Sequence, residues 1–135
     1  MADRQEFRGQ VDFAGTTNLK ATTVCVPAAV TTYSGNDGSI PVTSAYANID
    51  AGGSARTGLR FASAGTAGQI LVVQNSGGEK LTFHNTEGTA LLRGINADHD
   101  TMPAGYVGLF VSDGTLWNLI AGGVDTQPDA GMVAS

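Results

Sequence analysis

The chain has 135 residues, of which 41% are hydrophobic and only 14% are charged, and its formal net charge is −5. This length suits one domain with a modest core and is too short for two typical domains. An acidic chain with no basic run, no apolar signal core and no apolar stretch of transmembrane length argues against nucleic acid or a membrane as a partner, and for synthesis in a cytoplasm-like compartment.

The first 20 residues are polar, and their few apolar residues, Phe7, Val11 and Phe13 among them, are separated by charged residues and glycine. Such a segment has too little apolar surface to order itself. We therefore predict an extended N-terminal arm over residues 1–20 that docks on a partner or stays mobile, with one short candidate strand over residues 10–14.

After the arm, short apolar runs alternate with turn residues, and no convincing amphipathic helix occurs. Strands are predicted over residues 21–26, 39–48, 57–63, 68–74, 79–84, 89–95, 105–112 and 115–121. Regular short strands are typical of a sandwich or a small barrel. We expect one all-β domain over residues 21–121, a small β-sandwich or a jelly-roll or barrel-like variant of it, and an aperiodic, disordered tail over residues 122–135.

Two strand pairs are predicted to be hairpins. Residues 68–74 and 79–84 flank the turn sequence "NSGG", and residues 105–112 and 115–121 flank Asp113-Gly114, a pair that favours a tight two-residue turn. Residues 70–73 and 106–111 are apolar on both faces, although a strand with one buried face should alternate. Either a neighbouring subunit or a loop of the same chain must cover the second face.

The sequence has no recognised catalytic motif. A G-x-S-x-G motif and a dinucleotide fingerprint are absent, and "GSARTGLR" lacks the Lys and Ser/Thr of a phosphate loop. In "NADHDTMP", Asn96, Asp98 and Asp100 are spaced like calcium ligands, but Thr101 stands where an EF-hand has glycine. Cys25 in "TVCVP" is interpreted as a small buried hydrophobe. We expect no cofactor, no metal and a structural or binding role.

The segment "GTAGQILVVQNSGGEKLTFHNTEGTALLRG", followed by "DTMPAGYVGLFVSDGTLWNLIAGG", resembles the β-sandwich modules of tailed-bacteriophage virion proteins. The resemblance covers about residues 56–121, and "EFRGQVDFAGTTNL" is similar to short repeats in the stems of phage fibres. A small acidic β-domain with an arm, but without a long stem or attachment domain, resembles capsid decoration (cement) proteins in particular. This implies a non-enzymatic protein of the outer capsid surface, present in the host cytoplasm during assembly, that stabilises the expanded head, commonly as a homotrimer.

Two groups of residues are expected to carry this role. In the arm, apolar contacts and ionic contacts would bind the major capsid protein through Arg4, Phe7, Arg8, Val11 and Phe13. The candidates for the contact between subunits are Ile70, Val72, Tyr106, Phe110 and Trp117. Trp117 and Phe83 are interpreted first as core residues and only second as interface residues.

Two alternatives stay open. A tail-fibre or receptor-binding module would recognise a host surface glycan through the loops at residues 33–39 and 96–103, where Tyr33 is the one aromatic residue clearly suited to stacking on a sugar. A small enzyme such as a glycan hydrolase would need a carboxylate pair across a cleft. The loops offer Asp37, Asp50, Asp98 and Asp100 for such a pair.

Overall fold

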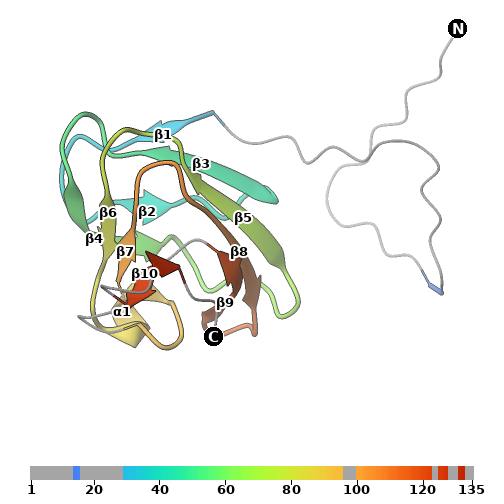
Figure 1. Cartoon of the computed structure of the whole chain (residues 1–135). Coiled ribbons are helices and arrows are strands. Elements are labelled where there is room, and N and C mark those ends of the chain that lie inside the picture. Colours follow the sequence, from blue (N-terminus) through green and yellow to red (C-terminus); the bar gives the residue numbers. More distant parts are fainter. Residues whose placement is uncertain (1–13, 16–28, 96–99, 123–124, 128–130, 133–135) are drawn as a thin grey trace, which may run out of the picture.

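The protein is described by a computed structural model for residues 14–15, 29–95, 100–122, 125–127 and 131–132, in which two mixed β-sheets pack together (Figure 1). Sheet 1 has the order β1 (Thr31–Thr32), β3 (Tyr46–Asp50), β5 (Ile70–Asn75), β8 (Val107–Ser112), β9 (Trp117–Gly122). Sheet 2 has the order β11 (Gly131–Met132), β10 (Asp125–Gln127), β7 (Thr101–Met102), β6 (Leu81–Phe83), β4 (Arg56–Phe61), β2 (Ser39–Ile40). The prediction of a small all-β, sandwich-like domain is confirmed.

The strands from β1 to β6 wind as a coil that alternates between the two sheets. Strands β1, β3 and β5 are parallel neighbours in sheet 1, and β2, β4 and β6 are parallel neighbours in sheet 2. Hydrogen bonds between successive turns continue through the corners, as where Tyr33 N donates to Asp50 O at 2.9 Å and Asp37 N donates to Thr57 O at 2.8 Å. Parallel strands need a crossover connection, and here a strand of the opposite sheet supplies it.

This winding overturns the first predicted hairpin, because β5 lies in sheet 1 and β6 in sheet 2. The reason lies in Asn75, which is fully buried at the end of β5. Its Nδ2 donates to the carbonyl oxygens of Glu79 at 2.9 Å and of Met102 and Pro103 at 3.1 Å each. The side chain thus binds the turn to residues of the second sheet, and "NSGG" becomes a corner of the coil.

The predicted strand over residues 39–48 is also divided between the sheets, into β2 and β3. Pro41 follows β2 directly. Proline has no N–H group to offer to a ladder, so the strand ends there and the chain crosses to the other layer.

The second hairpin is confirmed, since β8 and β9 pair antiparallel with Ser112 opposite Trp117. Its turn is longer than predicted, because residues 113–116 form the loop and only Gly114 among them has a positive φ, at 91°. A tight type I′ turn would require positive φ at both central residues. Instead the Asp113 carboxylate accepts hydrogen bonds from Thr115 N at 2.9 Å and Leu116 N at 2.8 Å, which stabilises the wider loop.

The predicted strand over residues 89–95 is wrong. The chain forms one helical turn, α1 (Glu87–Ala90), which ends at Leu91 with a left-handed φ of 57°. Ala90 and Leu92 are both buried, and this two-residue spacing is the one expected of a strand. The backbone is nevertheless helical there, because Ala90 N donates to Thr86 O. Leu92 then makes an isolated parallel bridge with Trp117 beside β9.

The segment predicted to be a disordered tail contributes strands to sheet 2. Strand β10 pairs with β7 through Asp125 and Thr101, and β11 pairs with β10. Backbone hydrogen bonds to a sheet edge need no hydrophobic period, which is why the sequence pattern did not indicate them. The candidate strand over residues 21–26 and residues 10–13 of the candidate strand 10–14 lie outside the described residues.

Aromatic side chains from both sheets form the centre of the core. Phe61 of β4 lies 5.8 Å from Phe83 of β6, 5.2 Å from Phe110 of β8 and 5.3 Å from Trp117 of β9, measured between ring centroids. Phe110 and Trp117 have no exposed surface, and Phe61 and Phe83 have almost none. The sheets are therefore held together by one shared cluster.

Candidate functional site

The surface that stands out is the outer face of sheet 1. On β5, Leu71 and Val73 are buried in the core, whereas Ile70 is 55% exposed and Val72 is half-buried on the opposite face. Only one face of β5 therefore packs in the core, and no described part of the chain covers Ile70 and Val72 on its other face completely.

Strands β8 and β9 continue this face. Val107 is 45% exposed, Leu109 and Val111 are half-buried, and all three point away from the core because Phe110 points into it. Val72 lies opposite Leu109, and Ile70 lies opposite Val111. On β9, Ile120 is 52% exposed at a bulge in the ladder. We call these residues the aliphatic face: Ile70, Val72, Val107, Leu109, Val111 and Ile120.

The aliphatic face carries no charge, since β5, β8 and β9 contain no Asp, Glu, Lys or Arg. Sheet 2 is different. There Arg60, Thr82 and Thr101 alternate with the buried residues of β4, β6 and β7, so their side chains face outward. An exposed sheet face is normally polar. Sheet 2 follows this rule and the aliphatic face does not.

Polar side chains border the aliphatic face on the β3 side. Val72 lies opposite Tyr46, whose hydroxyl group donates to Gln74 Oε1. The buried Oδ1 atom of Asn48 has no hydrogen-bond partner among the described residues. The apolar surface is thus limited to three strands of sheet 1, namely β5, β8 and β9.

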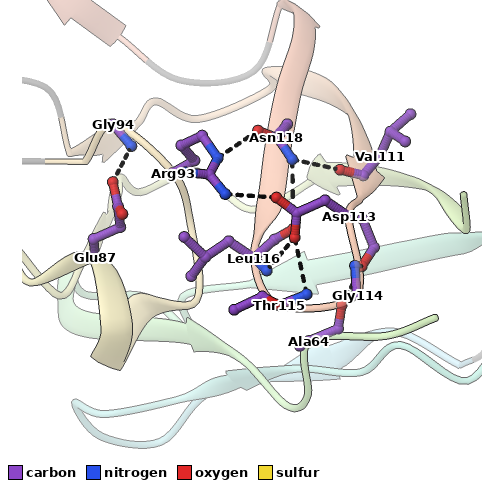
Figure 2. Close-up of polar contacts among 11 residues, drawn as sticks. Ala64, Glu87, Arg93, Gly94, Val111, Asp113, Gly114, Thr115, Leu116 and Asn118 are labelled. Atoms are coloured by element: carbon purple, nitrogen blue, oxygen red, sulfur yellow. Dashed lines mark hydrogen bonds and ion pairs between the residues drawn. The ribbon is translucent and has the colours of Figure 1, made fainter. Parts of the chain in front are cut away.

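A polar network closes the opposite border, beside β9 (Figure 2). Arg93 donates to the carboxylate of Asp113 through Nη2 and to Asn118 Oδ1 through Nε, the latter at 3.0 Å. Glu87 Oε2 accepts a hydrogen bond from Gly94 N at 2.7 Å. These contacts hold residues 91–95 against the edge of β9, where Trp117 N also donates to Leu91 O at 2.8 Å.

The same network shifts the acidity of Asp113. Hydrogen bonds from Leu116 N, then from the Arg93 side chain and from Thr115 N, hold the pKa of this carboxyl group well below its ordinary value. Asp113 in turn raises the pKa of Arg93. Because the folded-state pKa of Asp113 is depressed, its contribution to stability is complete above the unfolded-state pKa, about 3.9, and is lost as the pH falls through the folded-state value.

We expect Asp113→Asn to lower the melting temperature modestly above about pH 5, because the neutral amide binds the guanidinium group and the backbone amides less well. The difference from the wild type should shrink as the pH falls below about 4. Thermal unfolding followed by circular dichroism across this range would measure it. A difference that stays constant down to about pH 2.5 would contradict the role of the ionised carboxylate.

The structure divides the predicted subunit-contact residues into two groups. Ile70, Val72 and Tyr106 lie on the surface, and Tyr106 is 38% exposed. Phe110 and Trp117 are buried in the chain's own core, where Trp117 Nε1 donates to Ser63 O at 2.8 Å, so they offer no surface to a neighbour. The sequence places apolar residues on both faces of β8, and packing against Phe61 is what turns Phe110 and Trp117 inward.

The outward residues of β8 are Val107, Leu109 and Val111, on the side opposite to Phe110, and the prediction did not include them. The arm residues Arg4, Phe7, Arg8, Val11 and Phe13 lie outside the described residues.

Tyr33, the residue considered for stacking on a sugar, is buried rather than exposed, with 7% of its surface accessible. Its hydroxyl group donates to Ser39 O at 2.8 Å, and its ring lies so close to Gly38 that a Cβ atom there would come within 2.5 Å of it. Burial raises the pKa of the Tyr33 hydroxyl. Arg60 N donates to Gly38 O and Ala62 N donates to Ile40 O, so these two carbonyl groups of β2 point toward β4. The carbonyl group of Ser39, between them, points the other way, toward the free edge of β2, where the Tyr33 hydroxyl group binds it.

The carboxylates considered for catalysis have local partners. Asp37 lies 3.4 Å from Arg60 Nη2, Asp50 Oδ1 accepts from Gly52 N at 2.8 Å, and Asp100 Oδ1 accepts from Thr101 Oγ1 at 3.2 Å. Asp98 lies outside the described residues. Where the structure describes the chain, it does not bring three or more His, Cys, Asp or Glu side chains together as metal ligands. The described helix is also too short to span a membrane.

Comparisons with protein-family models, with curated proteins and with solved structures give no match for this chain.

Proposed function

We propose that this chain is a structural protein of a tailed-phage virion, which decorates the outside of the capsid as a homotrimer and stabilises the expanded head. The resemblance over about residues 56–121 supports the virion class. The observation that supports an assembled, structural role most directly is the contrast between the two outer faces. Sheet 1 exposes Ile70, Val107 and Ile120 around half-buried aliphatics, whereas sheet 2 exposes polar side chains. A domain of this kind is suited to having one side covered and the other in water.

The action proposed is mechanical. Expansion of a head shell during DNA packaging creates new sites where shell subunits meet. A rigid homotrimer that bridges those sites adds binding free energy to the expanded state only, and mass action then favours that state against internal pressure. The shared aromatic cluster of Phe61, Phe83, Phe110 and Trp117 supplies the rigidity, because it ties both sheets into one core.

The decisive experiment locates and counts the chain on intact virions. Gold-labelled antibody would give its position, and gel densitometry against the major capsid protein would give its copy number. Many copies spread over the head would support decoration. A few copies at the tail tip would overturn it in favour of receptor binding, and activity against host polysaccharide would overturn it in favour of an enzyme.

Deleting residues 1–14 is expected to abolish binding to expanded heads and to leave the oligomer intact. The arm contributes the apolar residues Phe7, Val11 and Phe13 and the cations Arg4 and Arg8, which would lie along the shell and add an edge strand to it. Co-sedimentation with purified heads measures the binding. Phe7→Ala should weaken it and the neighbouring Gln5→Ala should not, and retained binding by the deletion variant would refute the role of the arm.

A further inference from the structure

We propose that copies of this chain contact one another through the aliphatic face of sheet 1. The inference deepens the proposed function, because it rests on the chain being homo-oligomeric and names the surface and the partner of that contact. It does not depend on where in a virion the oligomer is found.

The aliphatic face is built like the centre of an interface. Ile70, Val107 and Ile120 are each about half exposed, although nothing on sheet 2 is comparable among the described residues. Around these side chains lie polar groups, with Tyr46, Asn48 and Gln74 on the β3 side and the Arg93–Asp113 pair beside β9. An apolar centre within a polar rim is the usual anatomy of a protein contact.

Charge favours a second copy as the occupant. The chain carries a net charge of −5, so two copies lose least to charge repulsion when they meet through a surface that bears no acid. Strands β5, β8 and β9 provide that surface. The absence of cations from these strands also disfavours nucleic acid and anionic lipid headgroups, which are bound through Lys and Arg.

The centre of the face is continuously aliphatic. In the β5–β8 pair, Val72 lies opposite Leu109 and Ile70 lies opposite Val111. Copies that bring these residues together, whether as a pair or around a three-fold axis, would therefore pack aliphatic side chains against aliphatic side chains.

The size of the face predicts the strength of the contact. Three neighbouring strands about 4.8 Å apart, each six residues long, span roughly 15 Å across the strands and roughly 20 Å along them. That is small beside the roughly 800 Å² of accessible surface per partner in a typical stable complex. The contact should therefore dissociate on dilution of the free protein and persist where copies are held close together on a particle.

The test is sedimentation of the purified full chain from about 1 to about 100 µM, with folding verified by near-ultraviolet circular dichroism. The wild type should pass from the 13.7 kDa monomer to an oligomer as the concentration rises. Ile70→Asp should remain folded, because this side chain is already half exposed, and should dissociate at a concentration at least tenfold higher. Ile120→Asp is an independent second variant of the same face.

Thr57→Asp is the matched control, because it adds the same charge at an exposed position of β4 in sheet 2. It should associate as the wild type does. The proposal is overturned if the wild type is monomeric throughout, or if folded Ile70→Asp and Ile120→Asp associate like the wild type. If the face is needed for association but virions carry no copies on the head, the proposed function fails and this contact stands.

Discussion

Replacing Asn75 with alanine is expected to lower the free energy of unfolding by roughly 3 to 5 kcal/mol. Its Nδ2 group is the donor for the carbonyl oxygens of Glu79, Met102 and Pro103, and its Oδ1 accepts from Gly77 N. Alanine removes these bonds at a buried position, and a buried polar group left without a partner costs about 1 to 3 kcal/mol. Asn75→Asp should be at least as harmful, because a carboxylate would face three carbonyl oxygens.

Urea denaturation measures this loss, with the emission of Trp117 as the probe, because it is the only tryptophan and is fully buried. The melting temperature should fall by roughly 10 °C or more. Asn85→Ala and Asn85→Asp are the matched controls, since Asn85 is exposed, and both should change stability by less than about 0.5 kcal/mol. If Asn75→Ala loses no more than these controls, the side chain does not hold the corner.

Trp117→Ala should destabilise the domain by about 3 to 5 kcal/mol, because it removes the largest fully buried side chain from the cluster around Phe61. It also leaves Ser63 O without the indole N–H that binds it. Trp117→Phe keeps an aromatic ring on Phe61 but loses that donor, so it should fall between alanine and the wild type.

Circular dichroism must report the unfolding of these variants, because the fluorescent probe is lost with Trp117. The control is Tyr106→Ala, which removes a side chain that is 38% exposed and should cost far less. The measurement belongs at low protein concentration, where self-association does not add to stability. Equal losses for Trp117→Ala and Tyr106→Ala would contradict the assignment of Trp117 to the core.

The parts of the fold that were predictable are those in which neighbours in the sequence are also neighbours in a sheet. The β8–β9 hairpin is of this kind, because Asp113 and Gly114 stand between two apolar runs and the partner strand is only a few residues away. The alternation of Val107, Leu109 and Val111 with Phe110 is also visible in the sequence. Its direction differs from the prediction at Phe110, which points into the core, whereas Trp117 is buried as its first interpretation as a core residue predicts.

The parts that were not predictable depend on contacts between distant residues. "NSGG" is a good turn sequence in either a hairpin or a corner, and the bonds from Asn75 to Met102 and Pro103 decide between them. In the same way, the sequence around Tyr33 predicts an exposed aromatic residue in a loop, and only the contacts with Ser39 O and Gly38 bury it. One helical turn at α1 was hidden because Ala90 and Leu92 have the spacing of a strand.

The sequence by itself determined that this is a small all-β domain, because short apolar runs separated by turn residues permit little else, and it determined that β5 and β8 are apolar on both faces. Only the tertiary structure decided which face is inside. Backbone hydrogen bonds form equally well within a sheet or at a corner, so the choice depends on packing across the layers, where Phe61 receives Phe110 and Trp117. Once those rings occupy the core, Ile70, Val107 and Ile120 are left on the outside, and the surface proposed to join copies of the chain follows from that packing.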